Sequence, residues 1–369
     1  MSGRMVCVDD FEEFSKKHLS KATWEFYSGG ADECQTVSEN RNAFKRFRLR
    51  PRFLRDVSHR DLSTTLLGER VECPICVSPT GLKDLACPQG DIYTAKVAAE
   101  METCMVVSTF SNSSAEDIMS ASPCSLKWFQ MYFMPNKVFT QRLVQKVERA
   151  GYKALVVTID LPIVGKRYSD IRNKFQLPPH VTVPNLLALK DGSEQDSAKD
   201  GRNYGMGGSP QDPTFSWKDV DWLSSITSLP IILKGILTAE DAGIALDHPG
   251  VKGILVSNHG GRQLDGVPAT VEALPEIVRA VGNKLEVYLD GGVRTGTDAL
   301  KALALGARAV FIGRPVIWGL TFKGEEGVRQ VMNILRDELD LAMALSGCCT
   351  LGDIQPTLVV REDFYHSRL

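Results

Sequence analysis

The chain of 369 residues carries 43 lysines and arginines against 45 aspartates and glutamates, a net charge of −2. This balance, without long blocks of either sign, argues against a nucleic-acid partner or a polybasic membrane surface. No window approaches 18 consecutive apolar residues and the first ten residues lack an apolar signal core, so we expect neither a membrane span nor secretion.

The nine cysteines are odd in number and scattered along a chain long enough to fold without crosslinks, so reduced thiols are expected. Cys73 and Cys76 form a C-x-x-C pattern, but no second pair or histidine pair lies nearby. We interpret them as core residues and expect no metal site.

Residues 1–70 are expected to form a helical extension. The pattern is amphipathic over 11–19, Ser20 can cap a second helix, and a third helix is predicted over 34–47. Residues 51–68 are irregular and basic, and after them the character of the chain changes.

From residue 74 onward, short apolar runs alternate with helical patterns. The runs interpreted as strands cover 74–77, 104–107, 126–129, 154–157, 230–233, 253–256, 285–289 and 309–312. The helical stretches cover 90–100, 115–120, 136–150, 239–247, 270–281, 297–305 and 325–346. Eight alternating units with continuous apolar strands predict an α/β fold, a (β/α)8 TIM barrel that makes residues 1–369 one domain. A doubly wound sheet is the alternative, weakened because no G-x-G-x-x-G follows the first strand.

The connection over 170–217 is far longer than the others and is rich in glycine and polar residues. It follows the fourth strand, on the side of a barrel where active sites are built. Loops of this length on compact domains usually serve a function, so we interpret it as a lid.

Polar residues follow the end of each predicted strand. In strand order they include Ser78 to Gly81, Ser108, Gln130 to Tyr132, Thr158 to Asp160 with Arg167, Lys234, His259 with Arg262, Asp290 to Arg294, and Gly313 with Arg314. Catalytic groups of barrel enzymes come from the carboxyl ends of several strands, so these residues are the candidate site.

The groups after strands seven and eight are typical of a phosphate site. Glycines allow backbone N–H groups to approach a phosphate, and Arg294 and Arg314 add positive charge. Gln130 and Thr158 could hydrogen-bond a heterocycle, and Lys234 could stabilise negative charge on it, which favours FMN. Nicotinamide fits less well without a dinucleotide motif, and pyridoxal phosphate would need Lys234 as a Schiff base.

His259 follows the sixth strand, and Arg262 comes three residues later across two glycines. The spacing places a possible proton acceptor beside a possible anion clamp. Chemistry on a small carboxylate is therefore indicated.

Six segments together resemble the FMN-dependent L-2-hydroxy acid oxidases, the relatives of glycolate oxidase and lactate oxidase. They are SNHGGRQLDGVPAT at 257–270, DGGVRTG at 290–296, GRP at 313–315, FQMY at 129–132, VVTID at 156–160 and ILKGI at 232–236. The resemblance extends over about residues 6–360. Within the family, the sequence is most similar to the peroxisomal animal oxidases of longer-chain acids.

The resemblance implies specific roles. His259 would be the catalytic base, oriented by Asp160, while Arg167, Arg262 and Tyr132 would bind the substrate. Lys234 would lie near flavin N1, and the backbone of Pro79 to Gly81 would face N5. The cofactor-binding residues expected in all are Pro79, Thr80, Gly81, Ser108, Gln130, Thr158, Lys234, Ser257, Asp290, Gly291, Gly292, Arg294, Gly313 and Arg314.

Three residues depart from the pattern of the glycolate-active relatives. Phe26 replaces a tyrosine that contacts the substrate carboxylate, and Phe110 replaces a tryptophan over the pocket, so both are expected to favour longer, less polar acids. Gly81 replaces an alanine beside N5, which bears on the electron acceptor.

The resemblance implies oxidation of medium- or long-chain L-2-hydroxy acids to 2-oxo acids, with O2 reduced to hydrogen peroxide. An FMN-dependent dehydrogenase or monooxygenase is one alternative, and a catalytically silent flavin- or acid-binding barrel is another. A homotetramer is expected from the family. The terminal Ser367-Arg368-Leu369 is a variant of the peroxisomal address, so we expect an import receptor as partner and the peroxisome as location.

Overall fold

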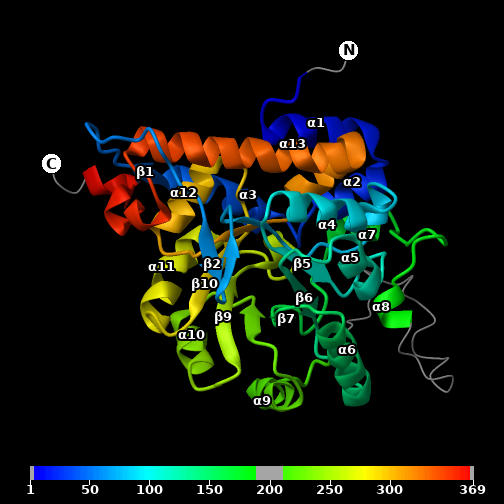
Figure 1. The fold of residues 1–369 in the computed structure, drawn as a ribbon. Helices are drawn as coiled ribbons and strands as arrows, with labels where there is room; N and C mark the ends of the chain where they lie inside the picture. Colours follow the sequence, from blue (N-terminus) through cyan, green and yellow to red (C-terminus); the bar gives the residue numbers. More distant parts are fainter. Residues whose placement is uncertain (1–3, 188–210, 366–369) are drawn as a thin grey trace.

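The computed structural model describes residues 4–187 and 211–365. Its centre is a closed barrel of eight parallel strands, seen from the side in Figure 1. Their spatial order is β10-β11-β4-β5-β6-β7-β8-β9. The barrel strands are β4 (Ile75–Val77), β5 (Met105–Ser108), β6 (Lys127–Met131), β7 (Leu155–Thr158), β8 (Ile231–Lys234), β9 (Val251–Val256), β10 (Glu286–Asp290) and β11 (Val310–Ile312). The predicted TIM barrel is confirmed, and each strand lies within one or two residues of its expected position.

The barrel strands are buried on both faces, as their continuous apolar sequences predict. One set of side chains fills the barrel interior, where Trp128, Tyr288 and Phe311 pack their rings together. The other set packs against the surrounding helices. The interior is therefore a packed core, and only the end formed by the carboxyl termini of the strands is left for a ligand.

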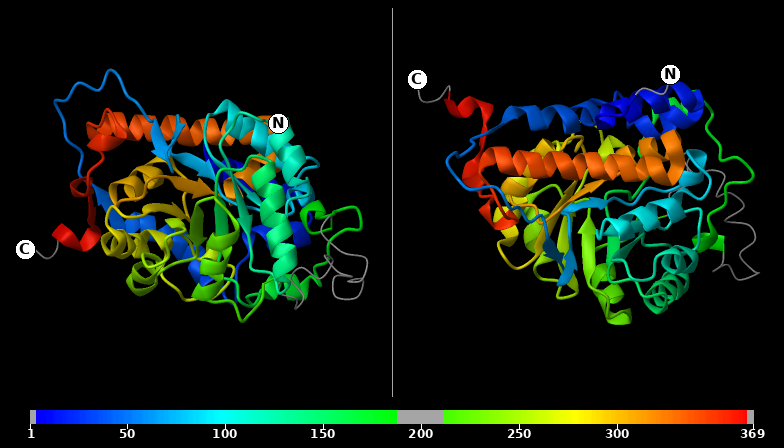
Figure 2. Two further views of the ribbon diagram at one scale, coloured as in Figure 1. Left: turned by 60° about the horizontal axis from the view of Figure 1, so that its bottom comes forward. Right: turned by 45° about the horizontal axis from the view of Figure 1, so that its top comes forward.

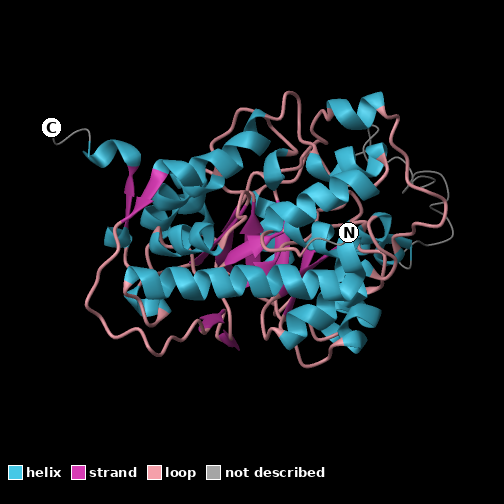
Figure 3. Cartoon of the chain, turned by 90° about the horizontal axis from the view of Figure 1, so that it is seen from above, coloured by secondary structure: helices cyan, strands magenta, loops and turns pink. Residues whose placement is uncertain are grey.

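Helices surround the barrel strands (Figure 3). They are α4 (Gly90–Glu100), α5 (Ala115–Ala121), α6 (Lys137–Arg149), α7 (Tyr168–Arg172), α8 (Pro184–Leu187), α9 (Trp217–Ile226), α10 (Ala239–Ala245), α11 (Thr270–Val281), α12 (Gly296–Ala304) and α13 (Arg314–Ser346). Of the expected 170–217 lid, residues 188–210 lie outside the described residues, and the described part contains α8 and most of α7.

Helix α13 begins at Arg314, directly after β11, whereas the sequence predicted a last helix from 325. Pro315 occupies the first turn, where its missing N–H is harmless. The helix is interrupted at Lys323 and Gly324, whose backbone angles are not helical, so only the part beyond the interruption shows an undisturbed helical pattern.

The N-terminal segment forms α1 (Val8–His18), α2 (Lys21–Ser28) and α3 (Gln35–Asn42). As predicted, Ser20 caps α2 by accepting a hydrogen bond from the Thr23 N–H. Helix α1 lies alongside α13 (Figure 2). Phe11 and Phe14 pack on Phe322. This packing carries the end of α2 to the mouth of the barrel.

The first 70 residues are not wholly helical, and this expectation was wrong in part. Residues expected to end the third helix form a 3₁₀ turn and strand β1 (Phe47–Leu49), which pairs with β12 (Val359–Arg361). Strands β2 (Thr64–Leu66) and β3 (Glu69–Val71) form a hairpin within and just beyond the stretch expected to be irregular. The partner of β1 is distant in the sequence, whereas β2 and β3 pair with each other across the short turn at Leu67 and Gly68.

Among the described residues, no helix is both long enough and apolar enough to cross a bilayer. All nine cysteines are free thiols. Burial raises the pKa of Cys73 to about 12 and that of Cys76 to about 11, which keeps both protonated at neutral pH.

Candidate active site

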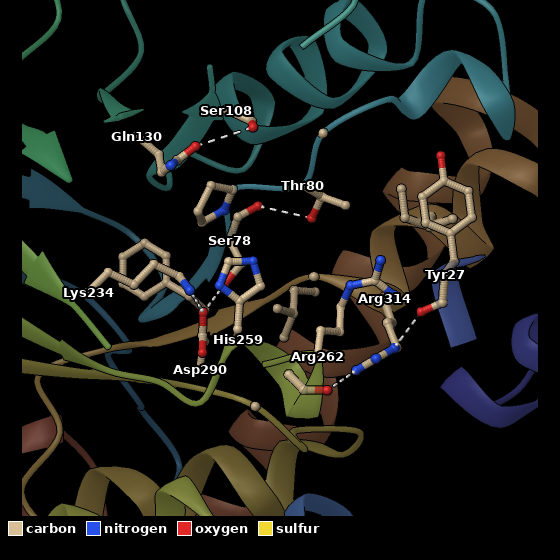
Figure 4. Close-up of a pocket in the computed structure, with 18 of the residues that line it drawn as sticks. Tyr27, Ser78, Thr80, Ser108, Gln130, Lys234, His259, Arg262, Asp290 and Arg314 are labelled. Atoms are coloured by element: carbon tan, nitrogen blue, oxygen red, sulfur yellow. Dashed lines mark hydrogen bonds and ion pairs between the residues drawn. The ribbon is translucent and has the colours of Figure 1, made fainter. Parts of the chain in front are cut away.

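A cavity opens at the carboxyl ends of the barrel strands and has a volume of about 1000 Å³, including space open to solvent. The cavity is lined by residues from the ends of all eight barrel strands, from α2 and from α13. They are Phe26, Tyr27, Ser78, Pro79, Thr80, Gly81, Leu82, Ser108, Gln130, Tyr132, Thr158, Lys234, His259, Gly260, Arg262, Asp290, Gly291, Gly292, Val293, Arg294, Phe311, Ile312, Gly313, Arg314 and Ile317. Figure 4 shows eighteen of them.

Most of the predicted site residues therefore meet in one place. Four predicted residues do not line this cavity: Phe110, Asp160, Arg167 and Ser257. Each nevertheless contacts a residue that does. Asp160 bonds His259, Ser257 bonds Lys234, Phe110 packs on Tyr132, and Arg167 bonds the backbone of Arg262.

His259 and Asp160 form the closest pair of titratable groups at the cavity. His259 Nδ1 lies 2.7 Å from Asp160 Oδ1, and both side chains are largely buried. Burial pushes the pKa of Asp160 up, but His259 and Lys234 outweigh it and hold the pKa below its ordinary value. Burial lowers the pKa of His259, although Asp160 opposes this. Asp160 is thus ionised and accepts the Nδ1 proton, which leaves His259 Nε2 as a free proton acceptor at neutral pH.

The turn from Asn258 to Gly261, which positions His259, has an unusual left-handed backbone conformation. His259 has a φ of 56°, and the next two glycines also have positive φ. A Cβ at Gly261 would lie 2.7 Å from the backbone nitrogen of Val37 on α3, so only glycine allows this close approach. Asn258 secures the turn by accepting the Gly261 N–H and bonding Asn40.

Lys234 lies at the end of β8 within a polar cluster on the cavity wall (Figure 4). Its Nζ donates to Ser257 Oγ at 2.9 Å and lies 3.5 Å from Asp290 Oδ2. The other Asp290 oxygen is buried without a hydrogen bond to the described part of the chain. A ligand that carries both hydrogen-bond donors and acceptors could satisfy the remaining hydrogen-bonding capacity of Lys234 and Asp290 at this wall.

At the opposite end, the cavity has the features of a phosphate site. Gly291 and Gly292 have φ values of 96° and 88°, and a Cβ at Gly292 would lie 1.8 Å from the Asn40 carbonyl oxygen. Helix α13 begins here, so its first N–H groups and positive dipole face the cavity. The buried Arg294 Nε has no hydrogen bond within the described residues, and the nearest carboxylate oxygen, Glu12 Oε2, lies 3.8 Å from it, too far for a hydrogen bond.

Arg314 differs from the expected simple phosphate ligand. Its three guanidinium nitrogens donate to the backbone carbonyls of Tyr27, Gly260 and Gly29. Burial, together with the nearby Arg294, lowers the pKa of Arg314 to about 10. Arg314 therefore joins α2 to the His259 turn while contributing positive charge to this end of the cavity.

Two arginines and an aspartate form a charged group beside His259. Arg262 lines the cavity, and its Nη1 donates to the carbonyls of Phe26 and Gly29 at the end of α2. Arg167 lies behind it, donating Nε to the Arg262 carbonyl, and its buried Nη1 has no hydrogen bond within the described chain. Asp170 lies 3.9 Å from that Nη1, and burial raises its pKa although Arg262 and Arg167 oppose the shift.

Aromatic rings form the apolar side of the site. Phe26 stacks on Phe175 with centroids 4.4 Å apart, and the Arg262 guanidinium lies 4.9 Å above the Phe26 ring. Phe110 packs edge-on against Tyr132 at 5.8 Å. A Cβ at Gly81 would lie 2.7 Å from the Phe110 Cβ, so these two unusual residues are in direct steric contact.

The sequence alone did not identify Tyr27, Phe175 or Ile317 as part of this region. Tyr27 lines the cavity and donates its hydroxyl to the Leu82 carbonyl, but it comes from a helix far from the barrel in sequence. Phe175 lies in the segment predicted to be a lid, and Ile317 lies in the unrecognised first turns of α13. No periodicity or motif marks any of the three.

The arrangement fits FMN. It offers a cradle of glycines, a helix N-terminus and arginines for a phosphate, and it offers Gln130, Thr158 and Ser108 as polar groups for the edge of a ring. Gln130 Nε2 donates to Thr158 Oγ1, and Ser108 Oγ donates to Gln130 Oε1. No group of three or more metal-ligating side chains occurs in the portions of the chain that the structure describes.

The family model for FMN-dependent dehydrogenases matches residues 15–361. Bovine 2-hydroxyacid oxidase 2 is 50% identical over 355 residues, which cover 96% of this chain and 98% of that protein. Human 2-hydroxyacid oxidase 1 is 46% identical over 371 residues, which cover 100% of both chains. A crystal structure of a variant of an active (S)-mandelate dehydrogenase chimera superposes with a TM-score of 0.90 and 34% identity, covering 97% of this chain and 100% of that one.

Proposed function

The chain belongs to the FMN-dependent 2-hydroxyacid oxidase family, and from this membership we propose how its own residues perform the reaction. The protein is an FMN-dependent enzyme that oxidises L-2-hydroxy acids to 2-oxo acids, with O2 as electron acceptor. FMN, when bound, supplies the acceptor for the two electrons of the substrate. The observation that carries the assignment of roles is the His259–Asp160 pair, 2.7 Å apart, beside a cavity that also contains Lys234 and Arg262.

We propose that His259 Nε2 accepts the proton released when the hydroxylated carbon of the substrate is oxidised. Asp160 holds the imidazole in the tautomer with the proton on Nδ1 and stabilises the imidazolium that forms. The lowered pKa of His259 keeps it neutral, and hence able to accept a proton, at neutral pH.

The substrate carboxylate is proposed to lie against Arg262 and Arg167, with Tyr132 as a further hydrogen-bonding group. Arg262 reaches the cavity directly, and Arg167 Nη1 is the buried donor without a hydrogen bond in the described chain. A carboxylate placed between the two guanidinium groups would satisfy that donor with a charge-assisted hydrogen bond. The positive charges also fix the acid end of the substrate relative to His259.

FMN is proposed to bind with its phosphate at Gly291, Gly292, Arg294 and Gly313, and with Arg314 adding charge from behind. Gln130, Thr158, Ser108 and Lys234 would contact the ring, with Ser257 and Asp290 fixing Lys234. The backbone from Pro79 to Gly81 would face the side of the ring where the electrons enter.

Medium- or long-chain 2-hydroxy acids are the proposed substrates. The stacked pair of Phe26 and Phe175 offers an apolar wall, and Phe26 has no hydroxyl to share with a carboxylate. Phe110 leaves more room than a tryptophan at the same place. Small polar acids such as glycolate would gain little from this wall, whereas an alkyl chain would bury apolar surface on it.

A substrate series tests the proposal. With FMN-loaded protein, kcat/KM should rise from glycolate through 2-hydroxybutanoate to 2-hydroxyoctanoate. Phe26→Tyr with Phe110→Trp is the matched variant, and it should shift the preference toward glycolate. A wild-type preference for glycolate would contradict the proposed chain length but leave the reaction itself standing.

Peroxisomal import through Ser367-Arg368-Leu369, which lies outside the described residues, and assembly as a homotetramer are also proposed. The first rests on the terminal tripeptide and the second on the family. A fluorescent protein carrying the last twelve or so residues should enter peroxisomes, and removal of Leu369 should abolish entry. Sedimentation velocity of the full chain measures the oligomer.

A further inference from the structure

A fully buried ion pair lies directly beneath the cavity, and the reaction described above does not use it. Lys83 Nζ lies 2.7 Å from Asp91 Oδ1, and neither side chain is exposed at all. Lys83 follows the loop after β4, and Asp91 lies in the first turn of α4. Taking two charges out of water is costly, so such a pair needs compensating contacts.

The compensating contacts lead to the cavity wall. Lys83 Nζ donates a second hydrogen bond to the Thr80 carbonyl oxygen at 2.8 Å. The second Asp91 oxygen accepts the Asn112 N–H at 2.7 Å, and Asn112 in turn accepts the Asp84 N–H. The ion pair therefore joins the loop after β4 to the loop after β5 and to helix α4.

The hydrogen bond to Thr80 fixes the orientation of one peptide group. In a trans peptide the C=O and the following N–H point in opposite directions, and the described chain has no cis peptide. Because Lys83 draws the Thr80 carbonyl down into the core, the Gly81 N–H points the other way. Thr80 and Gly81 both line the cavity, so this N–H faces into it.

The Gly81 N–H makes no hydrogen bond with any group in the described ranges. The next residue, Leu82, is held by two hydrogen bonds. Its N–H donates to the Phe110 carbonyl, and its own carbonyl accepts the Tyr27 hydroxyl. Leu82 also has a φ of 61°, which is unfavourable for leucine. The loop is thus held at two points, at Leu82 and at the Thr80 carbonyl, with one N–H left to serve a ligand.

We propose that Lys83, paired with Asp91, is a positioning residue that presents the Gly81 N–H to flavin N5. The proposal rests on the proposed function for the placement of FMN. Oxidised flavin has a lone pair on N5 that accepts this N–H. Two-electron reduction places a proton on N5 and removes that acceptor, so the N–H stabilises the oxidised form and lowers the reduction potential.

The test removes the pair as a whole, because Lys83→Met alone would leave the Asp91 carboxylate buried without a partner. In Lys83→Met/Asp91→Asn, the asparagine can still accept the Asn112 N–H, but nothing holds the Thr80 carbonyl. We expect the flavin reduction equilibrium to move about tenfold toward the reduced form, which is about 30 mV for a two-electron couple. The Kd of a 2-oxo acid product should stay within about twofold, because the arginines are untouched.

Crystal structures of the double variant, with or without FMN, report the orientation of the Thr80–Gly81 peptide directly. We expect that peptide to rotate or to adopt two orientations. The conservative variant Lys83→Gln/Asp91→Asn, which keeps a donor at residue 83, should give a smaller shift in potential.

Arg60→Met/Asp340→Asn is the matched control. Arg60 likewise joins a carboxylate, at 2.6 and 2.7 Å, to a backbone carbonyl, that of Val57, but it lies away from the cavity. The control should change thermal stability without changing the potential. An unchanged peptide and potential in the Lys83 double variant would overturn the proposal. If no 2-hydroxy acid reduced the flavin of the wild-type protein, the proposed function would be overturned instead.

Discussion

Replacing Asp160 with asparagine tests the proposed base most sharply, because the change is nearly isosteric and alters the carboxylate that hydrogen-bonds His259 Nδ1. The hydrogen bond that it alters is 2.7 Å long and joins side chains that are 17% and 11% exposed, so solvent screens it little. A hydrogen bond to a charged group contributes about 1.5–3 kcal/mol. At 1.36 kcal/mol for each factor of ten, kcat should fall about 10- to 150-fold.

The pH dependence separates this cause from a general loss of structure. Activity requires neutral His259, so kcat/KM rises with pH as the imidazolium loses its proton and then reaches a plateau. Burial lowers the pKa of His259 and Asp160 raises it, so the asparagine variant should have a still lower pKa. Its acidic limb should therefore move to lower pH while the plateau falls.

The assay is the rate of anaerobic flavin bleaching over a range of 2-hydroxy acid concentrations, from about pH 4.5 to 9. The rate at low concentration follows kcat/KM, and the rate at saturation gives the limiting rate of reduction. Asp265→Asn is the control. The Asp265 carboxylate lies in the same loop segment as His259, but it accepts the backbone N–H groups of Gln35 and Thr36 and not the imidazole proton. The control should leave the acidic limb in place. A wild-type rate in Asp160→Asn, or an acidic limb that moves to higher pH, would refute the proposed pairing.

Three further substitutions probe the substrate side of the cavity. Phe26→Tyr should raise kcat/KM for glycolate about tenfold, because the hydroxyl adds a hydrogen bond to a charged carboxylate; equal gains for 2-hydroxyoctanoate would contradict this reason. Gly81→Ala should destabilise the protein by about 1–3 kcal/mol in urea unfolding, because its Cβ would lie 2.7 Å from the Phe110 Cβ. The loss should shrink in a Phe110→Gly background, which removes the Phe110 Cβ that alanine would keep, and additive effects would show that the contact is not the cause. Arg167→Met should raise KM for every 2-hydroxy acid about 10- to 100-fold by removing a charged donor, and a normal KM would place the carboxylate elsewhere.

The barrel could be predicted because its determinants are local. A parallel strand buried on both faces must be apolar throughout, so each strand, from Ile75 to Ile312, is visible as a run in the sequence. The carboxyl ends of such strands meet at one face, which brings His259 and Lys234 together without further information.

The elements that could not be predicted include one that depends on a distant partner and one that is interrupted. Strand β1 pairs with β12, which lies more than three hundred residues later, so the sequence around Phe47 resembles the end of a helix. The first turns of α13 are hidden by the interruption at Gly324.

Within the site, two of the residues missed act through backbone groups. Tyr27 donates to the Leu82 carbonyl and Lys83 to the Thr80 carbonyl, and a backbone acceptor leaves no trace in the sequence. Arg314 was expected to meet a phosphate, yet its guanidinium also bonds three carbonyls that only the fold brings together.

Anaerobic reduction of the FMN-loaded protein by a panel of 2-hydroxy acids, followed by addition of O2, tests the central claim most directly. The L acids should bleach the flavin while their D enantiomers do not, and O2 should restore the oxidised spectrum with one hydrogen peroxide formed for each 2-oxo acid. A flavin that no 2-hydroxy acid reduces, or a reduced flavin that O2 does not reoxidise, would contradict the account.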